Sequence, residues 1–386
     1  MPSLAAHNIA DLQRAAHRRL PSVVWRYIEG GAEDEVTLRA NRAAFEQIHF
    51  TPRTLVDVSQ RSQKVTVLGL PYDSPFGIAP MGPLGICRYL ADISLARAAR
   101  AANVPFTLSI HAFVSLARVA AASGGAPWVQ VYLPADRGRA QEELAHVRAA
   151  GCEVLMLTTD VPVRGNREYN TRAGFDVPLR PGLRTVAEGL MHPRWLIDVY
   201  LRSLAGRRIR HSRLRRDMHD WRDFDWLRAA WPGKLVVKGI LSAEDARLAA
   251  QHGADGVLVS NHGGRQLDGA PSPIEVLPSI LAAVRGRVAV FVDGGIRRGA
   301  DIVKALAMGA DMAFVGRAAL YGVAAGGEEG ASRALHILRS EIDRVLALLG
   351  CNSIAELGPH CIGRGGIPGP EPRPQGTKPT VVRIAG

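Results

Sequence analysis

The chain has few of the features that mark exported, metal-binding or membrane-spanning proteins. It carries only four cysteines, and none belongs to a CxxC pair or to a cysteine/histidine spacing typical of a metal site. No apolar run approaches roughly 18 residues, and charges interrupt the N-terminal segment where a signal peptide would need an apolar centre. We therefore expect a cytoplasmic protein with reduced thiols, no metal site, no export and no transmembrane helix.

The basic segment between Arg202 and Arg216 lacks interleaved aromatic residues, so nucleic acid is not expected as a partner. It nevertheless holds seven arginines and contributes to a formal charge of +12, which favours anionic partners. The segment at 190–204 just before it carries apolar residues at roughly helical spacing. We interpret the arginines either as a solvated surface or as the basic flank of a helix that lies on a membrane.

Eight short apolar runs, most of them followed by an amphipathic helical segment, indicate a repeating architecture in this chain of 386 residues. Parallel strands joined by right-handed helical crossovers can close into a barrel when there are eight of them. We therefore predict an α/β fold, a (β/α)8 TIM barrel, with a doubly wound sheet as the weaker alternative. The runs lie at 76–80, 106–110, 128–132, 154–160, 235–240, 256–261, 289–295 and 312–317.

Three segments fall outside this repeat. Helical periodicity at 9–28 and 37–48 predicts an N-terminal helical extension. About 60 residues separate the fourth run from the helix near Trp221, which predicts an insertion at about 162–220 of the length seen in lids and docking segments. We expect a single domain over 1–366 and a flexible tail, rich in proline and glycine, over 367–386.

Polar residues cluster at the ends of the apolar runs, where active sites of this fold lie. Directly after the sixth run, the loop that begins at Asn261 combines the imidazole of His262, two glycines and the permanent cation of Arg265. Such a loop can move a proton and hold an anion in the same reaction, although a purely structural loop is the alternative. Further polar residues at run ends are Gln130, Tyr132, Thr158, Asp160, Lys238 and Asp293.

Glycines and arginines after the seventh and eighth runs predict a phosphate site. Backbone N–H groups, helix N-termini and the cations of Arg297 and Arg317 would meet at the position where barrels commonly bind phosphate. Tight turns with solvent-facing arginines are the alternative. A phosphorylated cofactor bound there would reach Lys238, whose ammonium could stabilise a negatively charged ring. A structural ion pair of Lys238 with Asp293 or Asp160 is also open.

Together these segments resemble the FMN-dependent 2-hydroxy acid oxidase and dehydrogenase family, which includes glycolate oxidase, L-lactate dehydrogenase and mandelate dehydrogenase. The loop SNHGGRQLDG carries the resemblance, with QVYL, LTTDVPVRGNRE, VKGI, DGGIRRG and VGRA in family order over nearly the whole chain. The resemblance implies FMN as cofactor and the oxidation of an L-2-hydroxy acid, lactate-like or mandelate-like, to the 2-oxo acid. It also implies a homo-oligomer, a tetramer in much of the family.

The same resemblance implies a role for each candidate residue. His262 would be the catalytic base, and Asp160 would stabilise its protonated form. The substrate would contact His262 together with Tyr27, Tyr132, Arg167 and Arg265. The FMN-binding residues would be Pro80, Met81, Gly82, Ser109, Gln130, Thr158, Lys238, Ser260, Asp293, Gly294, Gly295, Arg297, Gly316 and Arg317.

Two departures from the plant glycolate oxidases bear on the electron acceptor and the substrate. Pro80, Met81 and Gly82 stand where those enzymes have PTA, and glycine at this position resembles the dehydrogenase members, which reduce a quinone or carrier rather than oxygen. His111 stands where they have tryptophan, so the substrate pocket differs. The segment at 192–201 resembles insertions of lactate and mandelate dehydrogenases. It favours a membrane quinone as electron acceptor and peripheral attachment to the inner face of the cell membrane, with oxygen or another carrier as the alternative acceptor.

Two other functions remain open from the sequence. One is a flavin-free, phosphate-binding TIM barrel that acts as a lyase or isomerase. The other is a non-catalytic barrel that binds membranes or acidic partners through its arginines.

Overall fold

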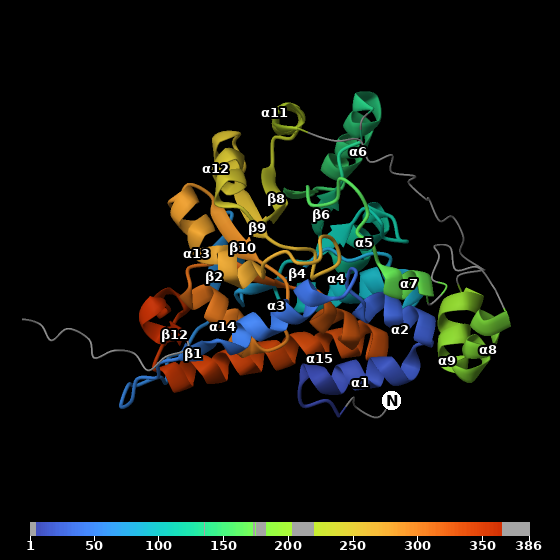
Figure 1. Ribbon diagram of the computed structural model, residues 1–386, viewed down its shortest axis with the longest axis horizontal. Coiled ribbons are helices and arrows are strands. Elements are labelled where there is room, and N and C mark those ends of the chain that lie inside the picture. The colour runs from blue at the N-terminus through green and yellow to red at the C-terminus, as the bar shows by residue number, and fades with distance from the viewer. Residues whose placement is uncertain (1–4, 135, 173, 175–182, 203–219, 365–386) are drawn as a thin grey trace, which may run out of the picture.

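Eight parallel strands form the centre of the molecule in a computed structural model, which describes residues 5–134, 136–172, 174, 183–202 and 220–364 (Figure 1). Each strand coincides with one predicted apolar run. They lie in the order β4-β11-β10-β9-β8-β7-β6-β5, and a parallel bridge between Ile78 and Phe106 joins the two ends. The predicted barrel is therefore confirmed. The strands are β4 (Phe76–Ile78), β5 (Thr107–Ser109), β6 (Trp128–Val131), β7 (Val154–Thr158), β8 (Lys234–Ile240), β9 (Gly256–Val259), β10 (Ala289–Val292) and β11 (Met312–Val315).

A helix follows every strand of the barrel and packs its apolar face outside the sheet. The longest, α15, breaks at Gly327, where φ is +64° and only glycine is unstrained. The helices are α4 (Ala91–Ala101), α5 (Leu116–Ser123), α6 (Arg137–Ala149), α11 (Trp221–Ala230), α12 (Ala243–Gln251), α13 (Pro273–Val284), α14 (Gly299–Ala307) and α15 (Arg317–Leu349). Strand and helix thus alternate throughout, as the right-handed crossovers of a parallel barrel require.

Apolar side chains fill the interior of the barrel, because alternate residues of each strand face inward. The rings of Trp128, Phe291 and Phe314 lie there with centroids 5.5 to 6.0 Å apart. Val67, in the hairpin of β2 (Val65–Val67) and β3 (Leu70–Tyr72), packs against this cluster and covers one end of the barrel. The opposite end, where the strands terminate, stays open to ligands.

The predicted N-terminal extension consists of α1 (Ile9–Arg19), α2 (Ser22–Glu29) and α3 (Val36–Glu46). Asn8 caps α1, and Pro21 separates α1 from α2, because proline lacks the N–H that a continuous helix would need. Helix α1 packs along α15 (Figure 1). After α3, β1 (Ile48–Phe50) pairs antiparallel with β12 (Ile362–Arg364), which follows the short turns η3 (Ile354–Glu356) and η4 (Pro359–Cys361).

The insertion after β7 forms a helical unit beside α2, at the right of Figure 1. It comprises α7 (Glu168–Arg172), α8 (Leu183–Met191), α9 (Pro193–Trp195) and the π-helical segment η2 (Leu196–Leu201). The arginines predicted beyond Arg202, and the tail at 367–386, lie outside the described residues. Within the described ranges, no helix combines the length and the apolar character needed to cross a membrane.

Candidate active site

Polar side chains surround the open mouth of the barrel because they continue the inward-facing rows of the strands. Lys238 lies two residues beyond the buried Val236, and residues two apart in a strand face the same side. Asp293 follows the inward-facing Phe291 with the same spacing. Ser109, Gln130, Thr158, Ser260 and Gly316 occupy equivalent places at the ends of β5, β6, β7, β9 and β11. The structure therefore gathers the predicted strand-end residues at one face.

His262 and Asp160 form a close pair from the loops after β9 and β7. Nδ1 of His262 lies 3.1 Å from each carboxylate oxygen of Asp160. The backbone of His262 has φ of +58°, a left-handed conformation that costs a non-glycine residue about 1–2 kcal/mol. Its N–H donates to Oγ of Ser260 at 3.1 Å, which helps to hold this conformation. The imidazole keeps 24% of its side chain exposed, and it lines the cavity at the mouth.

Burial, together with the charge of Lys238, favours a neutral imidazole beside a carboxylate. Burial lowers the pKa of His262 below 6.5, the charge of Asp160 opposes that shift, and the ammonium of Lys238 reinforces it. Burial raises the pKa of Asp160, but the charges of His262 and Lys238 outweigh this effect and leave it below 3.8. At neutral pH, His262 can therefore accept a proton, and Asp160 is placed to stabilise the cation that results.

Lys238 is the buried cation of the mouth. Only 3% of the residue is exposed, and its Nζ donates to Oγ of Ser260 at 2.8 Å. Nζ also lies 3.5 Å from Oδ2 of Asp293, so the ion pair considered from the sequence is present. A buried ammonium is costly unless it is paired. This pairing holds a positive charge at the barrel axis, beside the His262–Asp160 pair.

Arg265 and Arg167 bring two guanidiniums to the same cavity. Nη1 of Arg265 donates to the backbone oxygens of Tyr27 at 2.8 Å and Gly30 at 2.7 Å. Nε of Arg167 donates to the backbone oxygen of Arg265 at 3.0 Å. Burial, and then repulsion from Arg167, lower the pKa of Arg265 to about 10. Two neighbouring cations of this kind are suited to binding a carboxylate.

The predicted phosphate end lies where β10 and β11 terminate. Gly294 and Gly295 have φ of +91° and +83°, and a Cβ on Gly295 would overlap the backbone oxygen of Asn41, so glycine is required there. The guanidinium of Arg317 donates to backbone oxygens, among them that of Gly263 at 3.0 Å. Burial, and then the charges of Arg265 and Arg297, lower the pKa of Arg317 to about 10. This end therefore presents a strong positive field.

The two predicted tyrosines lie differently. Tyr27 lines the cavity, and its hydroxyl donates to the backbone oxygen of Gly82 at 2.7 Å. Tyr132 packs against His111, with ring centroids 5.4 Å apart, and is not among the residues that line the cavity. A Cβ on Gly82 would lie 2.9 Å from Cβ of His111, so this position is close-packed.

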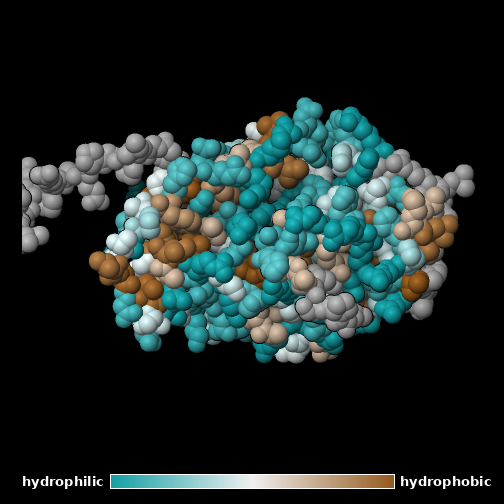
Figure 2. All heavy atoms as spheres, turned by 90° about the horizontal axis from the view of Figure 1, so that it is seen from below, coloured by the Kyte–Doolittle hydropathy of each residue, from teal (hydrophilic) through white to brown (hydrophobic). Residues whose placement is uncertain are grey.

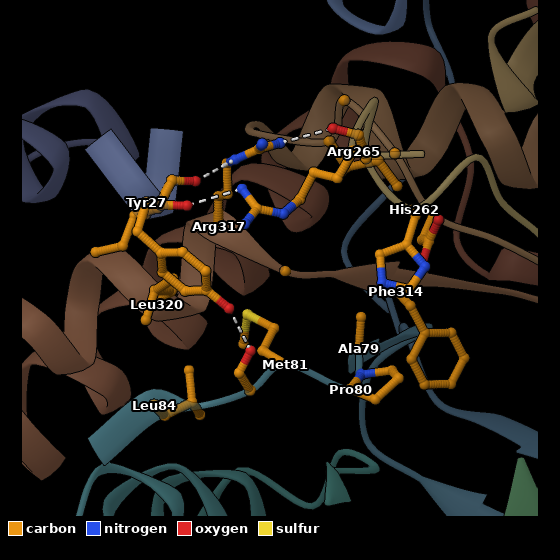
Figure 3. Close-up of a pocket in the computed structure, with 18 of the residues that line it drawn as sticks. Tyr27, Ala79, Pro80, Met81, Leu84, His262, Arg265, Phe314, Arg317 and Leu320 are labelled. Atoms are coloured by element: carbon orange, nitrogen blue, oxygen red, sulfur yellow. Dashed lines mark hydrogen bonds between the residues drawn. The ribbon is translucent and has the colours of Figure 1, made fainter. Parts of the chain in front are cut away.

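One cavity at the mouth of the barrel joins these groups (Figure 3). Its lining includes fourteen of the predicted residues: Tyr27, Pro80, Met81, Gly82, Arg167, Lys238, His262, Arg265, Asp293, Gly294, Gly295, Arg297, Gly316 and Arg317. Ser109, Gln130, Thr158, Asp160 and Ser260 stand behind this lining, in the ends of the strands and the loop after β7. The sequence did not single out the apolar lining residues Ile28, Leu84, Cys87, Phe314 and Leu320, because an apolar residue near a ligand has the same pattern as one in the core.

Two buried polar atoms at the mouth point to a planar, polar ligand. Nε2 of Gln130 and Oδ1 of Asp293 have no hydrogen-bond partner among the described residues. Oε1 of Gln130 accepts from Oγ of Ser109 at 3.0 Å, which fixes the direction of the amide. An unmet buried donor or acceptor costs about 1–3 kcal/mol, and a bound ring with polar edges would remove that cost.

These features define a barrel enzyme that performs acid–base chemistry on an anionic substrate beside a phosphorylated, ring-containing cofactor. The family model for FMN-dependent dehydrogenases matches residues 16–364, and the chain belongs to that family. FMN is the cofactor of the family, and the unmet polar atoms, the glycines and the cations of the mouth fit it. The enzyme is an FMN-dependent oxidoreductase, and nothing supports a flavin-free lyase or isomerase.

Similar proteins cover nearly the whole chain. The (S)-mandelate dehydrogenase of Pseudomonas putida is 41% identical over 374 residues, which are 93% of this chain and 94% of that protein. A putative L-lactate dehydrogenase of Mycobacterium tuberculosis is 41% identical over 371 residues, 92% of this chain and 89% of that protein. The crystal structure of the monotopic membrane protein (S)-mandelate dehydrogenase has a TM-score of 0.86 at 41% identity and covers 93% of this chain and 100% of its own.

Proposed function

We propose that the enzyme oxidises an (S)-2-hydroxy acid of the lactate or mandelate type to the corresponding 2-oxo acid. The observation that carries this proposal is the His262–Asp160 pair. Its imidazole lines the same cavity as Arg167 and Arg265. A 2-hydroxy acid needs a base for its proton and a cationic clamp for its carboxylate. Relatives named (S)-mandelate dehydrogenase and L-lactate dehydrogenase support this substrate class.

Bound FMN supplies the chemistry that accepts the two electrons removed from the substrate. We assign Pro80, Met81, Gly82, Ser109, Gln130, Thr158, Lys238 and Ser260 to the isoalloxazine ring. We assign Asp293, Gly294, Gly295, Arg297, Gly316 and Arg317 to the ribityl chain and the phosphate. The buried ammonium of Lys238 would stabilise negative charge that develops on a neighbouring ring, because it is fixed in place by Ser260 and Asp293.

His262 acts in this proposal as the base that takes a proton from the substrate. Asp160 bonds to Nδ1 and favours the tautomer whose proton is on that nitrogen, so Nε2 is the nitrogen that accepts. The lowered pKa of His262 keeps the imidazole neutral before the reaction. Once the proton arrives, the carboxylate of Asp160 stabilises the imidazolium.

Arg265 and Arg167 bind the substrate carboxylate in this proposal. The charge of Arg167 lowers the pKa of Arg265, and both residues line the cavity, so an anion bound beside them would relieve their mutual repulsion. Tyr27 and Tyr132 would orient the oxygen atoms of the substrate through their hydroxyls. The packing of Arg265 over the ring of Tyr27, with Cζ 4.9 Å from the centroid, keeps these two residues in a fixed relation.

We further propose that the enzyme lies on the inner face of the cell membrane and reduces a membrane quinone. The insertion exposes Leu190, Met191 and Ile197, which keep 66%, 71% and 55% of their surface exposed. Figure 2 shows brown, apolar atoms at the right of the molecule, on the side where Figure 1 places α8 and α9. The same insertion exposes two cations, Arg194 and Arg202, which suit an anionic lipid surface; Arg202 also pairs with Asp198 at 3.2 Å.

Co-sedimentation with vesicles that contain anionic phospholipid tests the membrane site. Replacing Leu190, Met191 and Ile197 together by glutamine should reduce binding strongly, because apolar burial and charge attraction act together at an interface. The control replaces Leu55 and Leu348, which are also exposed, by glutamine. Equal binding by both variants would contradict the membrane site. A homo-oligomer also remains a prediction, to be measured by light scattering of the same preparations.

Anaerobic reduction of bound FMN tests the oxidation itself. Adding (S)-mandelate, L-lactate or a longer 2-hydroxy acid without oxygen should bleach the visible flavin absorption, and the fastest substrate identifies the preferred side chain. His262→Ala should retain FMN but bleach about 10²–10⁴-fold more slowly, whereas replacing the exposed His336 should change nothing. Bleaching that survives His262→Ala, or no bleaching by any 2-hydroxy acid, would refute the assignment. Reoxidation with oxygen and with quinone would identify the acceptor.

A further inference from the structure

The cavity has two chemically different ends. Its cationic end is lined by Arg167, Arg265 and His262, which suit the carboxylate and the reacting hydroxyl of the substrate. Its other end, which we call the apolar end, is formed by Ile28, Leu84, Cys87 and Leu320. Figure 3 shows Leu84 and Leu320 on the side of the cavity opposite His262. Met81 lies between the two leucines and His262 in this view. The carboxylate and the reacting hydroxyl of the substrate gain nothing from the apolar end.

The apolar end is made by segments far apart in the chain. Ile28 comes from α2, Leu320 from the first turns of α15, and Leu84 and Cys87 from the turn η1 (Leu84–Ile86) and the residue after it. Burial raises the pKa of the Cys87 thiol well above its usual value, so this side chain is uncharged. Small-molecule sites are commonly apolar pockets with a few polar groups at the edge.

The insertion that carries the exposed apolar residues is bonded to the segments that form the apolar end. Nε1 of Trp195 donates to the backbone oxygen of Ile86 at 2.8 Å, and Trp195 is only 3% exposed. Oγ of Ser22, at the start of α2, donates to Glu188 at 2.6 Å. Asp198 lies 3.7 Å from Arg88, directly after Cys87. One side of the insertion therefore packs against the segments that line the cavity, while Leu190, Met191 and Ile197 remain on its exposed surface.

We propose that the apolar end binds the ring of a membrane quinone, which enters beside the insertion and leaves as the quinol. This inference rests on the proposed oxidation of a 2-hydroxy acid by FMN. The step balances when two electrons and one proton pass from the reduced cofactor to one quinone, the quinone takes its second proton from solvent, and His262 releases to solvent the proton that it took from the substrate. It separates the two substrates, because the polar acid uses the cationic end and the lipophilic acceptor uses the end next to the membrane-binding surface.

Photolabelling locates the quinone without relying on turnover. The FMN-loaded enzyme is irradiated with an azido-benzoquinone that carries one isoprenyl unit, and the labelled peptides are identified by mass spectrometry. We expect label in residues 83–92 or at the start of α15, and loss of that label when the unlabelled quinone is in excess. Label confined to other peptides, such as the cationic loop at 164–167, would overturn the proposal.

Equilibrium binding and half-reactions of Cys87→Leu test the same site. The larger side chain should weaken binding of the isoprenyl benzoquinone and slow reoxidation by it about tenfold, because overpacking removes space at the apolar end. Anaerobic bleaching by the hydroxy acid and reoxidation by ferricyanide should stay within about twofold. The control is Cys152→Leu, another buried cysteine, which lies just before β7 at the closed end of the barrel.

The outcomes distinguish failure of the proposed oxidation from failure of the proposed quinone site. Failure of the unsubstituted enzyme to bleach would remove the proposed oxidation, whereas normal bleaching with unchanged quinone binding in Cys87→Leu would remove only the quinone site. If Cys87→Leu does not retain FMN, Leu84→Ala replaces it. That variant enlarges the same end, and it should change quinone affinity while leaving bleaching unchanged. An equal effect on quinone and ferricyanide would also overturn the site.

Discussion

Asp160→Asn isolates the charge that supports His262. Asparagine has nearly the same shape and keeps an oxygen that can accept from Nδ1, so the main loss is one negative charge. Both carboxylate oxygens lie 3.1 Å from Nδ1. Opposite unit charges about 4 Å apart attract by about 4 kcal/mol at an effective dielectric constant of about 20. Each 1.4 kcal/mol or so corresponds to a tenfold change in rate, so the variant should lose about 10²–10³-fold in flavin reduction.

The pH dependence of kcat/KM provides a second test, because Asp160→Asn should shift it in a defined direction. Asp160 opposes the effect of burial on His262, so removing its charge should lower the pKa of His262 further. The acid limb of kcat/KM reports the protonation of the free enzyme's base, and it should therefore move to lower pH while the plateau falls.

The assay is stopped-flow bleaching by (S)-mandelate between pH 4.5 and 8, with FMN content measured for each preparation. The control is Asp311→Asn, because the carboxylate of Asp311 accepts from Val290 N–H at 2.7 Å, away from the mouth. A wild-type plateau in Asp160→Asn, or an acid limb that moves to higher pH, would refute the reasoning.

Three further results are expected. Lys238→Met should lower the reduction potential of bound FMN, measured by anaerobic dye equilibration, because the buried ammonium no longer stabilises the reduced cofactor; an unchanged potential would contradict that role. Gly295→Ala should reduce FMN content and thermal stability, because its Cβ would overlap Asn41, while Gly363→Ala, where the space is open, should have neither effect. The free energy of unfolding without FMN should fall as the pH drops through 6.5. Burial lowers the pKa of His262 in the folded protein, so the unfolded chain binds more protons in this range. Urea titrations should show that the free energy of unfolding depends less steeply on pH in His262→Gln than in the wild type.

The insertion after β7 illustrates how far local patterns reach. The sequence predicted a long excursion after the fourth strand and an apolar helix within it, and the described part of the insertion is helical. The place where the insertion packs against the barrel was not predictable, because the hydrogen bond from Trp195 to Ile86 joins residues 109 positions apart. Apolar residues of the cavity wall were missed for a related reason. Leu84 and Leu320 look like ordinary core residues until other segments are placed against them.

The sequence by itself determined the strands, the order of the repeat and the identity of the polar residues at the strand ends. Alternation along a strand and the turn chemistry of glycine are local properties, so they can be predicted without coordinates. Only the tertiary structure decided which of these residues meet. His262 and Asp160 are 102 residues apart, and the guanidinium of Arg265 reaches a backbone oxygen 238 residues away. Such contacts depend on how the barrel closes and on which side chains become buried away from water. Both are properties of the whole packed chain.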